Sequence, residues 1–544
     1  MKKSRVIPIV ITIIIWALMY YNILPPFNIH SEEMWMFILM AVLVGVAINA
    51  WTIIKSLLVP KEPTVVGSKR KVFARMKRNP IFILPLAIIV FFAGGILLSS
   101  PILRASAYNQ ILDVRTGDFA TDIKEVNYDQ IPILDSASAA KIAEREMGSM
   151  VDMVSQYEVS SYYNQINYQG KPVRVTPLRY GDLIKWITNR SQGVPAYMRI
   201  DMTTQDVDLI KLEDGIRYSP FEHFGRNLTR YVRFRYPTAM IRSVNFEIDE
   251  EGVPYWICSV EDKTIGLFGG TDIKGAIIVN AVTGEHVYHN VNETPKWMDK
   301  IYDAELLIEQ YNYYGTLKKG YINSVFGQRE CLRATDGYNY IALDDDVWVY
   351  TGVTSIGGDE SNVGFVLMNS RTKETNYYQI SGAEEYSAMA SAQGQVQHLR
   401  YEATFPILLN IADEPTYFLA LKDEAGLVKK YAMVNIQKYQ IVAIGDTVAE
   451  CEKAYRNLMA GSGIEVVNTD HATTLPNATI TMVTSIVADG NTYYYLMLEG
   501  ETDLFEIEAM NNLQVVKLRE GDQISVEYIP MDNGIGSVLS FEKR

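Results

Sequence analysis

Two glycine-rich segments stand at matching places in the sequence and have the residue types of a ligand-binding loop. They read GLFGGTDIKGA (266–276) and SIGGDESNVGF (355–365), and each follows a strand-like run that contains a tryptophan. Glycine permits positive φ and lets a backbone approach a ligand closely. The candidate ligand-binding residues of these loops are Gly269, Gly270, Asp272, Gly357, Gly358 and Asp359. The alternative is that both are wide hairpin turns, and neither has the Lys-Ser/Thr ending of a P-loop.

A basic stripe, RNLTRYVRFRY (226–236), is the second candidate site. If this segment is helical, Arg226, Arg230 and Arg233 share one face of the helix. Guanidinium groups bind carboxylates and phosphates through paired hydrogen bonds, so this face predicts contact with an anionic polymer. The alternative is that the three arginines pair with the chain's own surplus of acidic residues.

The residue types that most often carry catalysis or bind metals form no recognisable constellation. The three cysteines are far apart, and HExxH, CxxC and GxSxG motifs do not occur. His286 and His289 are three apart and would face opposite sides of a strand. Five acidic residues offer oxygen ligands in a spacing that matches no EF-hand: Asp344, Asp345, Asp346, Asp359 and Glu360. We therefore predict no enzyme activity, no cofactor and no catalytic or metal residue, while metal binding by 344–346 stays open.

The elements that must position these residues begin with three apolar stretches, 6–24, 34–58 and 81–98. Each has about the 18–20 residues that cross a bilayer as a helix. Basic residues are concentrated at the N-terminus and in 55–78, while the loop between the first two stretches has none. Because basic loops stay in the cytoplasm, we predict a cell-membrane protein with its N-terminus and loop 59–80 cytoplasmic and residues 102–544 extracytoplasmic.

The charge is distributed unevenly along the chain. Residues 1–101 hold 11 Lys and Arg against three acids, for a net +8, and residues 102–544 hold 39 against 61, for a net −22. Nucleic-acid binding depends on basic residues that neutralise phosphates. The acidic C-terminal part therefore argues against a nucleic-acid partner, and it also disfavours a domain that lies flat on anionic lipid.

One hairpin pattern occurs four times in the predicted extracytoplasmic part. Each copy is an apolar strand that ends at Asp201, Asn280, Asn369 or Asn435, with Thr or Lys three residues later and a second strand behind it. A short Asn or Asp side chain accepts local backbone N–H groups and favours a turn. Another strand pair precedes each copy, and helices are predicted before three of these pairs, at 136–154, 220–234 and 384–399.

The best copy, IIVNAVTGEHV, resembles the PepSY domain through Asn280, Thr283, Gly284 and Glu285. The other copies have no glycine at that position, and the resemblance spans about residues 130–460. It implies modules of one helix and an antiparallel sheet, as in peptidase propeptides and in bacterial membrane-anchored extracytoplasmic proteins. Such modules are associated with modulating proteases and with binding at the cell surface, and they supply no catalytic residues.

Residues 477–544 read as five or six short strands, QVVKL among them, which suggests a small OB-like barrel. The predicted fold class is α+β: three N-terminal transmembrane helices, PepSY-like helix-plus-antiparallel-sheet repeats and a C-terminal small β-barrel. The expected domains are 1–101 (anchor with a basic cytoplasmic loop), 102–295 (repeats one and two), 296–460 (repeats three and four), 461–476 (linker) and 477–544 (barrel).

The first functional hypothesis is a membrane-anchored extracytoplasmic binding or scaffold protein. Its partners would be the lipid bilayer and a protein outside the membrane, such as a peptidase or an envelope assembly. The second hypothesis is a binder of a cell-envelope polymer, either a glycan or an anionic wall polymer, through the arginine face or the glycine loops. An envelope enzyme ranks third. The sequence leaves open the ligand, the partner, the pathway and the oligomeric state.

Overall fold

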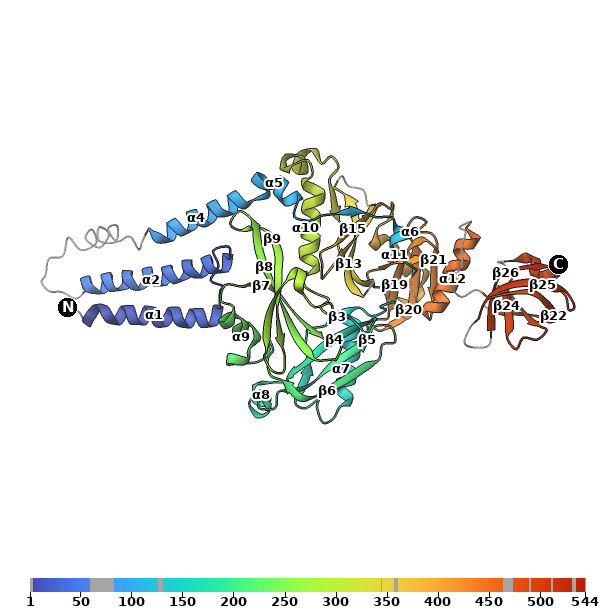
Figure 1. Cartoon of the computed structure of the whole chain (residues 1–544), viewed down its shortest axis with the longest axis horizontal. Coiled ribbons are helices and arrows are strands. Elements are labelled where there is room, and N and C mark those ends of the chain that lie inside the picture. The colour runs from blue at the N-terminus through green and yellow to red at the C-terminus, as the bar shows by residue number, and fades with distance from the viewer. Residues whose placement is uncertain are drawn as a thin grey trace.

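The computed structural model describes residues 3–58, 83–125, 131–343, 345–356, 361–462, 473–488, 491–509, 512–530 and 535–543. Apolar helices form one end of the molecule, four mainly antiparallel sheets form the middle, and a small barrel forms the other end (Figure 1).

The N-terminal helices are α1 (Lys3–Ile23), α2 (Glu32–Leu58) and α4 (Leu84–Ser99), and α5 (Pro101–Asn109) follows α4. Among the described residues, one helical stretch, Glu32–Thr52, is long and apolar enough to cross a membrane. The pair α4 and α5 adds a second only if its 44° bend is counted within one span, and the apolar part of α1, Ile9–Ile23, is shorter.

The prediction of three transmembrane helices is therefore wrong. The 16 residues of α4 extend for about 24 Å at 1.5 Å per residue, which is less than the hydrocarbon core of about 30 Å. Pro101 begins a new helix in another direction instead of extending α4. The predicted cytoplasmic loop 59–80 lies outside the described residues.

The middle of the chain is rich in sheet, and its first two sheets are antiparallel. The first sheet contains β2 (Tyr157–Val159), β3 (Asn164–Tyr168), β4 (Lys171–Tyr180), β5 (Val194–Asp201) and β6 (Val207–Ile216). The second contains β7 (Met240–Ile248), β8 (Pro254–Ile265), β9 (Gly269–Asn280) and β10 (His286–Asn290).

The third sheet has seven strands, and one of them comes from the segment that follows α5, which we call the stem. It contains β1 (Arg115–Thr116), β11 (Leu332–Ala334), β12 (Asn339–Leu343), β13 (Asp346–Ser355), β14 (Ser361–Asn369), β15 (Thr375–Tyr378) and β16 (Gly382–Ala383). Its strand β1 pairs in parallel with β15. The fourth sheet contains β17 (Glu402–Ala403), β18 (Ile407–Ile411), β19 (Glu414–Lys422), β20 (Val428–Asn435) and β21 (Val442–Gly445).

A helix precedes each sheet along the chain. These helices are α7 (Ser136–Ser149), α9 (Leu228–Arg235), α10 (Ala304–Leu317) and α11 (Glu385–Gln395). The sequence had not predicted α10. The other helices of this region are α6 (Phe119–Asp122), α8 (Leu183–Asn189) and α12 (Val448–Gly461). In α12, Thr447 and Glu450 form a capping box, which satisfies backbone donors at the start of the helix.

The four repeated turns use the predicted Asn/Asp chemistry. Asn280 Oδ1 accepts from the backbone N–H of Val282 and Thr283, both at 2.9 Å. The corresponding residues are Asp201, Asn369 and Asn435, and each also accepts from the N–H group three positions later. The prediction that this side chain closes the turn is thus confirmed. The repeated sequence pattern forms the turn between two strands in all four copies.

The C-terminal strands close into a five-stranded barrel of β22 (Thr473–Ala488), β23 (Asn491–Leu498), β24 (Leu504–Glu508), β26 (Ile535–Lys543) and β25 (Gln523–Pro530). Its strands β24 and β26 are parallel. The predicted strand QVVKL is instead part of a 3₁₀ helix, Leu513–Lys517. The barrel has its own apolar core, and Lys453 of α12 pairs with Glu506 of β24 at 2.5 Å.

Candidate functional site

The first glycine loop is the turn between β8 and β9, and it packs on the N-terminal helices. Ser99 Oγ at the end of α4 accepts from the backbone N–H of Leu267 at 2.8 Å and of Phe268 at 3.1 Å. A Cβ added at Gly269 would lie 2.5 Å from the Ser99 carbonyl oxygen and 2.2 Å from Tyr108 Oη. The loop needs glycine because it contacts this chain's own backbone, and at this position that contact leaves no room for a ligand.

Gly270 and Asp272 also serve contacts within the chain. Gly270 has φ +64°, and a Cβ there would meet Ile265 at 2.5 Å. The Asp272 carboxylate accepts from Lys373 Nζ at 2.8 Å and from Gln310 Nε2 at 3.2 Å. Asp272 therefore joins the second sheet to the third sheet and to α10.

The second glycine loop cannot be compared with the first, because Gly357, Gly358 and Asp359 lie outside the described residues. Among the acidic residues near it, Asp344 and Glu360 also lie outside. Asp346 forms a bidentate pair with Arg371, with both distances at 2.7 Å. Asp345 has φ +69° in the turn before β13.

The arginine stripe does not form one helix face. Asn227 caps α9 by accepting from the Arg230 N–H at 3.2 Å, and it separates Arg226, which lies in the 3₁₀ helix η3 (Phe224–Arg226), from the other two arginines. Arg226 Nη1 donates to the Arg190 carbonyl at 2.6 Å. Arg230 lies over the Tyr21 ring, with 4.1 Å from the guanidinium carbon to the ring centroid.

Arg233 is buried at the junction of α1 and the four sheets of the middle of the chain with their helices, which we call the β domain. Its Nε donates to the Leu24 carbonyl at 2.8 Å, and its Nη1 donates to the Ala239 carbonyl. Burial lowers the pKa of Arg233, because a charged group is disfavoured away from water. This guanidinium therefore holds two backbone segments together and is not available to a polymer.

The structure assembles a different candidate site, which sequence reasoning missed. A surface hollow of about 410 Å³ lies where β7, the start of α10 and the region of β12 meet. Its walls are formed by Arg242, Ser243, Asp303, Ala304, Glu305, Tyr338 and Tyr340. Hollows of this size that combine aromatic rings with a few directed polar groups are the usual form of a ligand site.

The polar wall of the hollow is held in place by an ion pair. Arg242 donates to Asp303 from Nε at 2.6 Å and from Nη2 at 3.2 Å. Asp303 also accepts from the Leu306 N–H at 2.9 Å as the N-cap of α10, and Arg242 Nη1 lies 3.7 Å from Glu261. This network engages the guanidinium with two carboxylates and so holds the polar wall in a fixed position.

The opposite wall is aromatic, and one polar atom in the hollow is unsatisfied. The rings of Tyr338 and Tyr340 meet edge to face with 5.6 Å between centroids, and Tyr338 is 39% exposed. Ser243 Oγ is buried and has no hydrogen-bond partner among the residues that the structure describes. A buried hydroxyl without a partner costs free energy, but this oxygen is shielded from solvent and is not a contact offered to a ligand.

A cluster of buried charges supports the aromatic wall from behind. Lys300 Nζ lies 3.8 Å from the Tyr340 ring centroid. Glu247 accepts from the backbone N–H of Asp299 at 3.0 Å and of Lys300 at 3.1 Å. Arg174, also buried, donates to Gln165 at 3.3 Å.

Burial dominates the acid–base behaviour of this cluster, because it disfavours every charged form. It raises the pKa of Glu247 to about 7 and lowers that of Lys300 to about 7. It also raises the pKa of Asp299, with the neighbouring Glu247 charge as a further cause. Tyr340 lines the hollow and Lys300 lies behind its ring, so these groups support the wall from within.

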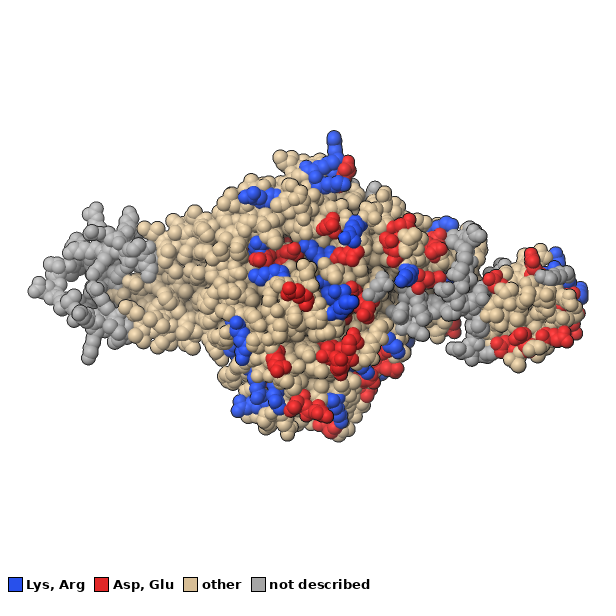
Figure 2. Space-filling model, viewed as in Figure 1, with Lys and Arg blue, Asp and Glu red and all other residues tan. Residues whose placement is uncertain are grey.

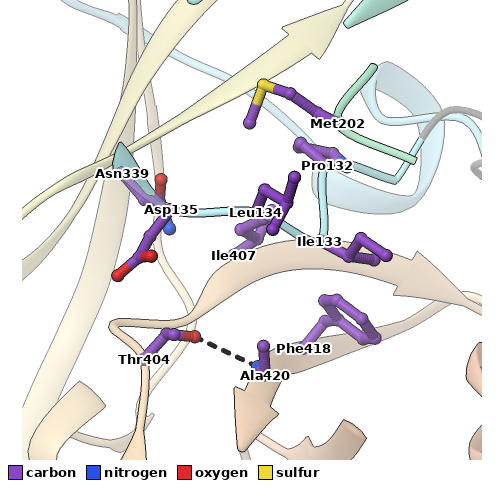
Figure 3. A pocket seen from close by; sticks show the side chains of 10 residues that line it. All are labelled: Pro132, Ile133, Leu134, Asp135, Met202, Asn339, Thr404, Ile407, Phe418 and Ala420. Carbon is purple, nitrogen blue, oxygen red and sulfur yellow. Dashed lines mark hydrogen bonds between the residues drawn. The ribbon is translucent and has the colours of Figure 1, made fainter. Parts of the chain in front are cut away.

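A second and smaller space lies between the segment 132–135 and the fourth sheet. It is a void of about 20 Å³ lined by Pro132, Ile133, Leu134, Asp135, Met202, Asn339, Thr404, Ile407, Phe418 and Ala420. Figure 3 shows these side chains and the bond that the Ala420 N–H donates to Thr404 Oγ1 at 3.0 Å. The void has room for about one water molecule, and we regard it as a packing defect.

No protein-family model and no curated protein matches this sequence. Among solved structures, an exo-1,5-α-L-arabinanase from a bovine ruminal metagenomic library has 8% identity and a TM-score of 0.15, covering 70% of this chain and 96% of that one. A B. megaterium levansucrase mutant has 9% identity and a TM-score of 0.17, covering 78% and 93%. At these scores the likenesses carry no argument for a shared fold or activity.

Proposed function

We propose that this chain is a membrane-associated binding and scaffold protein that holds a ligand- or partner-binding β domain at a fixed orientation to the lipid bilayer. The observation that carries the proposal is the direct docking of the exposed apolar helices on the β domain.

The helices present a surface that suits lipid better than water. Side chains more than half exposed recur on α1 and α4, with Ile14 at 53%, Leu18 at 58%, Leu86 at 62%, Val90 at 63% and Leu98 at 60%. Figure 2 shows this end of the molecule as an almost charge-free surface, apart from the residues not described. An apolar area that large on a soluble chain marks a membrane or protein contact.

The β domain contacts the helices and the loop between α1 and α2 at three points. His30 Nδ1, in the loop between α1 and α2, donates to the Leu267 carbonyl at 2.9 Å. The Phe27 N–H donates to the Pro237 carbonyl at 2.7 Å, and the Phe92 ring lies 4.9 Å from that of Phe268. Fixed contacts of this kind restrict rotation of the domain, which is what a scaffold at a surface requires.

Two experiments test this proposal. The first is extraction of cell membranes that carry the full chain with alkaline carbonate; the chain should stay in the pellet, and its release would refute membrane association. The second is photo-cross-linking in cells from a reactive residue at Tyr338, beside the hollow, with the same residue at Val487 on the barrel as control. A discrete protein adduct specific to Tyr338 supports a protein partner.

A second candidate function is binding of a cell-envelope polymer in the hollow, and the exposed Tyr338 beside Tyr340 favours it. Tyrosine rings offer large apolar faces against which sugar rings can pack, and Arg242 fixes the wall beside them through Asp303. In the same experiment, adducts to glycan or wall polymer alone would support this function over the protein partner. Purified polymer should then bind the wild-type chain and lose affinity in Arg242→Ala.

A further inference from the structure

An exposed apolar edge continues from the helical end onto the β domain. On α8, Leu183, Ile184 and Ile187 are 57%, 73% and 54% exposed, and Trp186 alone is buried. Phe224 of η3 and Phe234 of α9 are 64% and 55% exposed. Only Trp186 of α8 packs into the domain. The other apolar side chains of this helix are not covered by any described part of the chain.

The edge is physically continuous with the apolar helices. The Phe234 ring lies 6.5 Å from that of Tyr20 near the end of α1. The Phe224 ring lies 6.1 Å from that of Trp186, and η3 is bonded to the end of α8 through the Arg226–Arg190 hydrogen bond. A bilayer that surrounds α1 would therefore meet this edge at its surface.

Basic side chains accompany the apolar ones. Arg190 lies against the Trp186 ring at 5.1 Å, and Arg235 lies over the Tyr231 ring at 3.5 Å. Neither they nor Arg226 has a carboxylate oxygen within 4.0 Å in the described part of the chain, although ion pairs form nearby at Lys185 and Arg217. Figure 2 shows basic side chains over α8 and α9, on the side of the β domain next to the charge-free end.

We propose that the edge formed by α8, η3 and α9 is a second lipid contact, in which the apolar side chains enter the bilayer interface and the arginines bind lipid phosphate groups. This inference rests on the proposed membrane association. Exposed Leu, Ile and Phe beside unpaired arginines are the composition of interfacial segments, and each basic residue near an anionic surface adds attraction. The acidic character of the domain as a whole does not prevent this, because charges beyond about 8–10 Å are largely screened.

The test uses the full chain in lipid nanodiscs with an environment-sensitive dye on Ile184→Cys. The three native cysteines are buried, so labelling is selective, and a dye on Val487→Cys in the barrel is the matched control. In nanodiscs with phosphatidylglycerol, the dye at 184 should emit at shorter wavelength than at 487 and should be quenched by spin-labelled lipid. Arg190→Gln with Arg235→Gln should weaken this quenching more in phosphatidylglycerol nanodiscs than in pure phosphatidylcholine.

The outcomes separate the two proposals. A chain that enters nanodiscs with a dye at 184 as accessible to aqueous iodide as the dye at 487 overturns the lipid contact alone. A dye that is shielded from iodide without quenching by spin-labelled lipid shows that protein covers the edge, and this also overturns it. A chain that does not enter nanodiscs at all refutes membrane association and the inference together.

Discussion

Arg233 joins the apolar helices to the β domain, and its replacement should loosen this joint without unfolding the chain. The guanidinium bonds one carbonyl on each side of the joint, at Leu24 and Ala239. Arg233 is 6% exposed and Leu24 is 5% exposed, so water cannot easily replace the lost donors. In Arg233→Met the apolar stem remains, while both carbonyls lose a charged donor.

The expected cost follows from these two hydrogen bonds. Each bond to a charged group contributes about 1.5–3 kcal/mol, and removal of a buried charge offsets part of the loss, which leaves about 3 kcal/mol. Since about 1.4 kcal/mol is a tenfold change in an equilibrium constant, the open form of the joint should become about 100-fold more populated.

Amide hydrogen exchange measures this opening directly. The Phe27 N–H bonds across the joint to Pro237, and its exchange rate follows the population of the open form when reclosing is fast. Its protection should fall by about two orders of magnitude in Arg233→Met and stay nearly unchanged in the control Arg235→Met, whose side chain is exposed. Unchanged protection of Phe27 in Arg233→Met would refute the role that we assign to this arginine.

Three further outcomes are expected. The Glu247 carboxyl has its pKa raised from 4.5 to about 7 by burial, so the folded state binds the extra proton. The stability that this proton uptake contributes is present below pH 4.5 and is lost as pH rises through about 7. Chemical denaturation across this range should show that loss in the wild type relative to Glu247→Gln, and a constant difference would contradict it. Asn280→Ala removes the acceptor of two backbone N–H groups and should lower the unfolding free energy by about 1 kcal/mol, whereas Asn280→Asp should retain most of it; equal effects would disprove the turn argument. Gly269→Ala should clash with the Ser99 carbonyl and lower the unfolding free energy by about 1–3 kcal/mol. Gly94→Ala is the control, because no atom lies within 4 Å of its added Cβ, and it should leave thermal unfolding unchanged. Unchanged stability in Gly269→Ala would show that the loop does not pack on Ser99.

Local turn chemistry was predictable from the sequence because it depends on neighbours. Asn280 and its three counterparts close their turns through atoms two or three residues away, which a sequence pattern contains. The helix α10 was missed because its four consecutive positions Tyr311, Asn312, Tyr313 and Tyr314 are weak helix formers. Its apolar side packs in a core shared with two sheets, Asp303 caps its first turn, and together these interactions outweigh the propensity.

The number of spanning helices was overestimated for a similar reason. The sequence shows that residues 81–98 are apolar. Composition alone does not show where a helix bends. Pro101 starts α5 at 44° to α4, and Tyr108 of α5 then donates to the Ser99 carbonyl at 2.7 Å. The bend is thus fixed by a contact that only the folded chain forms.

The hollow could not be predicted from the sequence, because its walls come from three separated segments. Arg242 belongs to β7, Asp303 caps α10, and Tyr340 lies in β12. The arginine stripe was visible in the sequence, but Asn227 was a recognisable N-cap that divides it. That cap separates Arg226 from Arg230 and Arg233.

The parallel pair of β1 and β15 has a consequence for the order in which the chain can fold. Arg115 and Thr116 lie opposite Asn376 and Tyr377. The partner strand of the stem is therefore synthesised about 260 residues after the stem itself. At 5–20 residues per second, that delay is roughly 13–50 seconds. Until then the stem has no strand to join. Once paired, β1 covers an edge of the third sheet that would otherwise invite pairing with another chain.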